Sequence, residues 1–187
     1  MNILETVQTR RSIRRYQDRP VPDDIIADLI EAMRWAPSAG NLESRKFYFV
    51  FHKGRRRALA GAAGNPDLVS RMKQLVKTVV GSHPLSAAPL VIVACVDRRI
   101  ATRYGKRGEH LYAIQDVAAS LMNMMLVAHD RGLGTVWIGS FDEDAVAKVL
   151  DLPGHLRPVA LVPVGYPALV PAPPQRAPLE QVVEFVR

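Results

Sequence analysis

Residues 88–96 form a run of nine apolar residues, and this run constrains the fold more than any other part of the sequence. A strand that exposes one face to solvent alternates apolar and polar residues, and this segment does not alternate. The pattern therefore predicts a central strand whose sheet is covered by helices on both faces. The single cysteine, Cys95, lies in this strand, where we expect a buried structural thiol.

Periodicity and helix start and stop signals predict the other elements. Predicted helices are 22–36, 67–80, 109–131 and 142–150, and predicted strands are 46–52, 135–138 and 158–164. Helix 109–131 is apolar around most of its circumference, which indicates a position in the core or at a subunit interface. Residues 167–178 hold five prolines and so predict an extended arm that follows a surface. Helices and strands intermix, so we expect an α+β domain over residues 1–187, with 167–187 as the C-terminal arm.

Composition excludes several classes of protein. The hydrophobic and charged fractions, 48% and 23%, are those of a globular domain. We find no run long enough to cross a bilayer and no export signal at the N-terminus, so we expect a cytoplasmic protein without membrane contact. A Rossmann fingerprint is absent, because Gly132-Leu133-Gly134 is followed by Trp137 where a third glycine is needed. Neither a Walker loop nor metal-ligand spacing is present, and the five histidines are expected to be surface or capping groups.

The formal net charge of +7 allows three interpretations: a nucleic-acid surface, a site for an anionic cofactor, or solvated surface. Its arginines fall in several separate short groups, 10–11, 14–15, 55–57, 98–99 and 103–107. This dispersal disfavours a nucleic-acid partner. A bound phosphate monoester or an anionic nicotinamide cofactor accounts for part of the charge.

Three segments have the composition of ligand-binding loops. Residues 10–16 place four arginines and a serine together, and such groups bind phosphate, although a solvated basic turn has the same composition. Residues 36–42, Ala-Pro-Ser-Ala-Gly-Asn-Leu, let a backbone approach a flat ring closely, or form an ordinary turn. Residues 137–142 lead from a strand to a helix start, where free backbone N–H groups can face a ligand.

Together, in this order, these segments resemble the nitroreductase family. Val164-Gly165-Tyr166-Pro167 and the ending Arg176-Ala177-Pro178-Leu179-Glu180 extend the resemblance over essentially the whole chain. The resemblance implies a nitroreductase-like α+β fold, with a central mixed sheet flanked by helices. It also implies an intertwined homodimer with C-terminal arm exchange and two FMN sites at the interface.

The resemblance further implies a set of cofactor-binding residues. Arg10, Arg11 and Ser12 match positions that hold the FMN phosphate and the nearby flavin edge, and Arg176 matches a second phosphate ligand. Arg14 matches a basic residue beside the pyrimidine carbonyl. The loop that the other subunit lays against the flavin is matched by Pro37, Ser38, Ala39 and Asn41. Gly139 and Ser140 match the turn whose backbone N–H reaches flavin N5.

The implied activity is hydride transfer from NAD(P)H through flavin N5 to a small acceptor such as a nitroaromatic compound or a quinone. Donor and acceptor react in turn, and no catalytic side chain is required because the cofactor carries the chemistry. Two alternatives stay open: a branch resembling dimethylbenzimidazole synthase or the dehalogenases, and a non-catalytic basic binding domain.

The chain departs from the family at Glu43-Ser44-Arg45, where many relatives have Gln-Pro-aromatic. Substrate preference therefore does not carry over from the relatives. Asn65 and Lys73 lie where relatives can place flavin contacts, but neither is assigned. The sequence also leaves open the physiological acceptor and the choice between NADH and NADPH.

Overall fold

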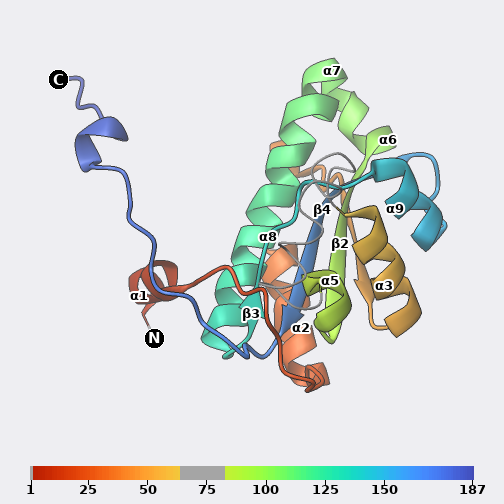
Figure 1. Ribbon diagram of the computed structural model, residues 1–187. Coiled ribbons are helices and arrows are strands. Elements are labelled where there is room, and N and C mark those ends of the chain that lie inside the picture. The colour runs from red at the N-terminus through yellow and green to blue at the C-terminus, as the bar shows by residue number, and fades with distance from the viewer. Residues whose placement is uncertain (1, 64–82) are drawn as a thin grey trace, which may run out of the picture.

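A four-stranded sheet in the order β1-β2-β4-β3 forms the centre of the computed structural model, which describes residues 2–63 and 83–187 (Figure 1). Its strands are β1 (Arg45–Val50), β2 (Leu90–Asp97), β3 (Gly134–Thr135) and β4 (Leu156–Gly165). The three ladders between these strands are antiparallel, and the isolated bridge between Ser12 and Thr135 is parallel. The helix-flanked α+β architecture is confirmed.

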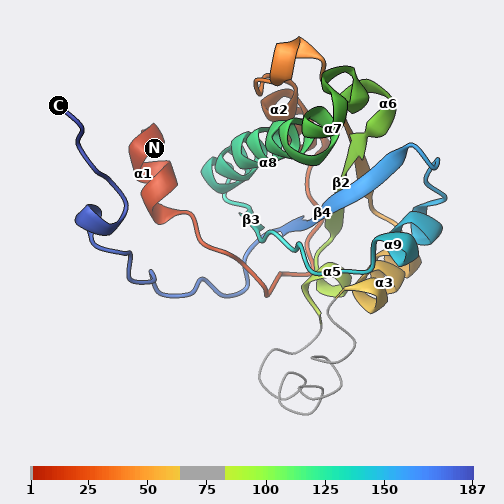
Figure 2. The same cartoon turned by 90° about the horizontal axis from the view of Figure 1, so that it is seen from above.

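The central strand is confirmed as β2, in which every residue is buried. Leu90, Ile92, Ala94 and Val96 pack on one face of the sheet with α2 (Asp23–Arg34) and α8 (Ala113–Asp130). The intervening residues pack on the other face with α3 (Lys53–Ala62), α5 (Pro84–Ala87) and α9 (Glu143–Leu150) (Figures 1 and 2). Each side chain of β2 therefore enters an apolar cluster, whichever face it points to, which explains the absence of alternation.

Burial also makes Cys95 a structural thiol, as predicted. Its side chain is fully buried, and burial raises its pKa to about 12. The thiol is therefore protonated at neutral pH and does not act as a nucleophile.

The remaining described elements are short. They are α1 (Ile3–Thr9), α6 (Arg98–Ala101), α7 (Gly105–Arg107), a π-helical turn (Gly108–Tyr112) and 3-10 turns at Ala39–Asn41, Thr102–Tyr104 and Leu179–Gln181. Sequence patterns did not indicate α3, α5 or α6. Predicted helix 67–80 lies outside the described residues.

Local sequence signals place two helix boundaries well. Helix α2 ends at Arg34, three residues before Pro37. Asp142 is the N-cap of α9, and its carboxylate accepts a hydrogen bond from the Ala145 N–H at 2.9 Å. The prediction of a strand over 135–138 was too long, since β3 covers only Gly134–Thr135 and Ile138 makes an isolated bridge to Leu161.

The two ends of the chain extend away from the sheet and its helices (Figures 1 and 2). After Pro167 the arm is extended, with one 3-10 turn, as the prolines predicted. Several of its apolar side chains are exposed, including Leu179, Val182, Phe185 and Val186. Nothing within the described part of the chain covers these side chains.

One helical stretch, Arg98–Asp130, is long and apolar enough to cross a membrane by length and composition alone, which differs from the sequence expectation. A core helix meets the same criteria, and 44% of the apolar window is buried. In this fold α8 packs against α2 and the sheet, which accounts for its apolar character.

Replacing Leu121 by Ala tests the role of α8 in the core. Leu121 is fully buried in the cluster between α8 and the sheet. We expect a loss of about 2–5 kcal/mol in the free energy of unfolding, because the change removes buried methyl groups and leaves a cavity. Chemical denaturation measures it, with Gln115→Ala on the exposed face of α8 as the control. A loss below about 1 kcal/mol would contradict the packing described.

Candidate functional site

A basic half-site forms where the chain leaves α1. We use this name for Arg10, Arg11, Ser12, Arg14 and Arg176. One guanidinium nitrogen of Arg10, Nη1, is buried and has no hydrogen-bond partner among the described residues. The pKa of Arg10 is lowered by burial first and then by the neighbouring charges of Arg11 and Arg176. A buried guanidinium nitrogen without a hydrogen-bond partner, beside two other cations, is costly unless an anion binds there.

Backbone contacts hold this half-site against β3. The Ile13 N–H donates to the carbonyl oxygen of Thr135 at 2.9 Å, and Ser12 bridges the same residue. Nη1 of Arg11 donates to the carbonyl oxygens of Gln8 and Arg10, both at 2.7 Å. The basic cluster is thus partly preorganised by its own backbone.

The segment after β3 continues from the basic half-site toward α9. Gly139 and Ser140 follow Thr135 on this segment, and both are exposed. Ser12 bridges Thr135, so the structure connects this turn to the basic half-site in the same chain. Asn65 and Lys73 lie outside the described residues.

His129 is a neighbour of the basic half-site that sequence reasoning did not single out. Its Nε2 lies 2.9 Å from the Thr9 hydroxyl oxygen. Burial, followed by the charges of Arg10 and Arg11, lowers its pKa. A neutral imidazole avoids a further positive charge beside the arginines.

Pro37, Ser38, Ala39 and Asn41 lie together in the second part of the site. Residues 37–42, here called the loop, connect α2 to β1. Gly40, Asn41 and Glu43 have φ angles of +54°, +53° and +51°, in the left-handed region. This conformation is unfavourable for residues other than glycine, so surrounding contacts must hold the loop in place.

Asp116 provides one of these contacts from α8. Its carboxylate, on a residue only 6% exposed, accepts a hydrogen bond from the Ala39 N–H at 2.9 Å. The Ser44 hydroxyl donates to the other carboxylate oxygen at 3.4 Å. A buried carboxylate on a largely apolar helix therefore holds the loop from inside the fold.

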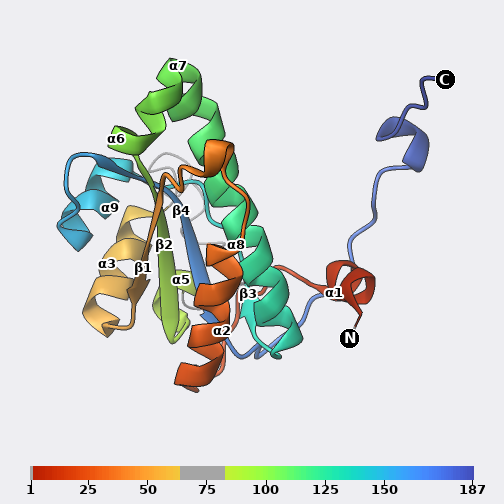
Figure 3. The same ribbon diagram turned by 180° about the vertical axis from the view of Figure 1, so that it is seen from behind.

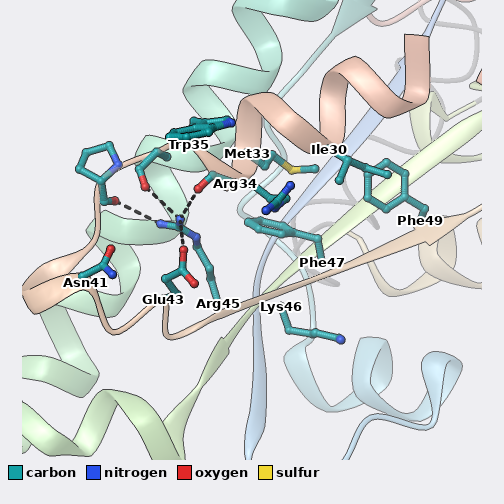
Figure 4. A pocket seen from close by; sticks show the side chains of 12 residues that line it. Ile30, Met33, Arg34, Trp35, Asn41, Glu43, Arg45, Lys46, Phe47 and Phe49 are labelled. Atoms are coloured by element: carbon teal, nitrogen blue, oxygen red, sulfur yellow. Dashed lines mark hydrogen bonds and ion pairs between the residues drawn. The ribbon is translucent and has the colours of Figure 1, made fainter. Parts of the chain in front are cut away.

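Arg45 holds the other side of the loop (Figure 4). Its guanidinium donates to the carbonyl oxygens of Arg34 at 3.1 Å, Ala36 at 2.9 Å and Pro37 at 3.2 Å. Glu43 forms an ion pair with it at 3.7 Å, and the Arg45 side chain is 5% exposed. Arg45 thus binds carbonyl groups at the C-terminal end of α2, which a helix leaves unpaired. We call these contacts of Arg45 the clamp. Arg45 stands at the aromatic position of the Gln-Pro-aromatic sequence, so the clamp results from this chain's departure from that sequence.

A cavity of about 740 Å³ lies beside the loop, between α2 and β1 (Figure 4). Ile30, Met33, Phe47 and Phe49 provide its apolar wall, and charged residues such as Lys46 lie at the loop end and along β1. Strand β1 is at the edge of the sheet. Among the described residues β1 pairs only with β2, so the cavity adjoins a strand edge that these residues leave unpaired.

Helix α8 separates the loop from the basic half-site. The loop contacts Asp116 near the start of α8, and α1 contacts His129 near its end. These contact points are thirteen positions apart, which corresponds to about 20 Å along a helix. Figure 3 shows the same separation, with the loop near α7 and α1 at the far end of α8. One chain therefore does not bring the two parts of the predicted site together.

The sequence profile described as Nitroreductase family matches residues 7–166, most of the chain. The chain belongs to the nitroreductase family. A relative from Methanothermobacter thermautotrophicus, named putative NADH dehydrogenase/NAD(P)H nitroreductase, is 32% identical over 90% of this chain and 78% of its own length. The FMN reductase (NADPH) of Bacillus subtilis is 26% identical over 97% of this chain and 72% of its own. The crystal structure of a putative NADH dehydrogenase/NAD(P)H nitroreductase from Parabacteroides distasonis has a TM-score of 0.79 at 27% identity, with full coverage of both chains.

Replacing Arg45 by Met tests the clamp. The variant keeps a long apolar side chain but leaves three carbonyl groups without their donor, so we expect a loss of about 1–3 kcal/mol in the free energy of unfolding. Chemical denaturation of both proteins measures the difference. Arg34→Met removes a guanidinium from the same helix end, but that side chain is 68% exposed, so its loss should stay within about 0.5 kcal/mol. Equal losses of unfolding free energy in the two variants would show that the hydrogen bonds of Arg45 do not stabilise the loop more than an exposed arginine does.

Proposed function

We propose that this protein is an NAD(P)H-dependent FMN oxidoreductase that works as a homodimer and reduces a small aromatic acceptor such as a nitroaromatic compound or a quinone. The observation that carries the proposal is the buried, unpartnered guanidinium nitrogen of Arg10, flanked by Arg11 and Arg176. Support also comes from the FMN reductase (NADPH) relative.

The basic half-site suits a phosphate monoester. The guanidinium groups of Arg11 and Arg176 are close enough to Arg10 to lower its pKa, Ser12 follows Arg11 in the chain, and guanidinium groups bind phosphate oxygens with two parallel hydrogen bonds. A phosphate there gives the Arg10 nitrogen a partner and offsets the mutual repulsion of the arginines. FMN ends in such a phosphate monoester, whereas flavin adenine dinucleotide does not.

The protein has a positioning role in the proposed reaction. When bound, FMN supplies hydride transfer at N5. With FMN bound, Arg14 would offset negative charge at the pyrimidine end of the ring, and the exposed backbone around Gly139 and Ser140 would supply an N–H donor to the ring. Donor and acceptor use the same open face in turn.

Two chains are needed for a complete site. The loop and the basic half-site lie at opposite ends of α8 in one chain, so a two-fold related partner supplies the loop that the first chain cannot. The exposed apolar arm of one chain then has a place to bind, namely the cavity beside β1 of the other. Glu180 and Glu184 of the arm complement Lys46 and Arg34 beside that cavity.

A cytoplasmic location completes the proposal. Cys95 is reduced and buried, and a reducing compartment suits such a thiol. The arginines around Arg10 have a role in cofactor binding, so the net charge does not require a nucleic-acid or membrane partner.

Replacing Arg10 or Arg176 by Ala should weaken FMN binding more than it slows turnover. Each change removes at least one charge-assisted hydrogen bond, so the FMN dissociation constant should rise at least about tenfold. Fluorescence titration of the apoprotein gives the constant, and turnover is measured with FMN in excess. Arg131→Ala is the control, because it removes an exposed cation that is paired with Asp28. Unchanged affinity in both variants, or purified protein without FMN, would contradict the proposal.

Truncation after Ala168 should abolish both FMN binding and dimer formation. The truncated protein keeps the hydrogen bond from the Ala168 N–H to the carbonyl oxygen of Arg15, but it lacks Arg176 and the rest of the arm. Sedimentation velocity with flavin absorbance recorded on the same boundary compares it with the full-length protein. Arg176→Ala in the full-length chain separates the two causes, since it should lower FMN occupancy and keep the dimer. A full-length monomer with one FMN per chain would overturn the shared site.

A further inference from the structure

Three cations near the start of α8 have no role in the function proposed above. Within residues 98–107, Arg98 pairs with Glu109 at 3.5 Å and Arg99 pairs with Asp97 at 2.8 Å. Arg103, Lys106 and Arg107 are exposed, and none of them is within ion-pair distance of a described carboxylate. Their positive charge is therefore available to an anion from solution.

A tight turn holds these cations together. Gly105 has a φ angle of +60°, which favours glycine, and at Gly108 a side chain would collide with the carbonyl oxygen of Ala101. The turn continues into the π-helical residues Gly108–Tyr112 (Figure 3). π-helical turns are rare and often occur at functional sites.

Tyr104 fixes this turn to the loop. A side chain at Gly40 would collide with the Tyr104 hydroxyl group, so the tyrosine lies directly against the loop. The ring of Tyr104 packs edge-to-face on Tyr112, with 6.0 Å between centroids. Arg107 lies 5.5 Å from the centroid of the Tyr112 ring, and its Nε donates to the Tyr112 hydroxyl oxygen at 3.0 Å. A continuous set of contacts therefore connects the loop to the guanidinium of Arg107.

We propose that Arg103, Lys106 and Arg107 bind the phosphate groups of the nicotinamide donor and make the enzyme prefer NADPH to NADH. This inference rests on the proposed function, in which the partner's loop completes the flavin site, and it adds that the donor approaches over that loop. The turn then stands beside the path of the donor, where cations meet its phosphates. NADPH carries an additional 2′-phosphate, a dianionic group near neutral pH, so a cluster of three cations discriminates in its favour.

The test compares donors in the FMN-loaded, full-length protein. The triple variant R103A/K106A/R107A and the wild type are assayed with NADPH, NADH and 1-benzyl-1,4-dihydronicotinamide, all with one uncharged quinone. We expect the ratio of kcat/KM for NADPH to that for NADH to fall at least about tenfold, the effect of one lost charge-assisted hydrogen bond. The benzyl donor has no phosphate, so its turnover should not change. Arg107→Lys should keep most of the preference, because it keeps the charge.

Controls separate this inference from its alternatives. Arg131→Ala removes one positive charge at the opposite end of α8 and should leave the ratio unchanged. FMN content and thermal stability, recorded for every variant, show that each protein is folded and loaded. An unchanged ratio in a loaded triple variant overturns the inference and leaves the proposed function intact. A fall in turnover with the benzyl donor also overturns it, since the turn would then act only by supporting the loop. Wild-type protein without FMN overturns both.

Discussion

Two contacts on α8, one at each end, determine how the rest of the site is arranged. Asp116 holds the loop through the Ala39 N–H, and His129 lies against Thr9, the residue before Arg10. Because the helix between them is a rigid rod buried against the sheet, the loop and the basic half-site are held at a fixed separation. The apolar surface of α8 thus has two roles: it completes the core, and it keeps the loop and the basic half-site apart within one chain.

Sequence patterns predicted the fold where local chemistry determines it. The unbroken apolar run became β2 because helices cover both faces, Pro37 lies just beyond the end of α2, and Asp142 caps α9. The error at 135–138 has a long-range cause. Gly134 and Thr135 pair with β4 on one side, while Ser12 and Ile13 contact Thr135 from a segment more than a hundred residues earlier. No local pattern indicates such a contact.

Motifs and the family resemblance predicted candidate site residues, but they did not predict the contacts that hold those residues in place. Asp116 lies 77 positions from Ala39 and binds it through one carboxylate oxygen. The only signal was an acidic residue among the apolar positions of the helix, which requires a buried partner. Arg45 gave a clearer signal, because it replaces an aromatic residue of many relatives. Only the structure shows that its guanidinium binds three carbonyl groups at the end of α2.

The unpaired edge of β1 exposes a newly made chain to unwanted strand pairing. Within the described residues, β1 pairs only with β2, and the adjoining cavity and the arm expose apolar surface. An uncovered strand edge accepts hydrogen bonds from any extended polypeptide, including damaged or unfolded neighbours. The exposed, charged Lys46 on this strand discourages such pairing but does not prevent it. In the proposed homodimer this edge would be covered only after assembly, so the apparent stability of the protein would rise with protomer concentration.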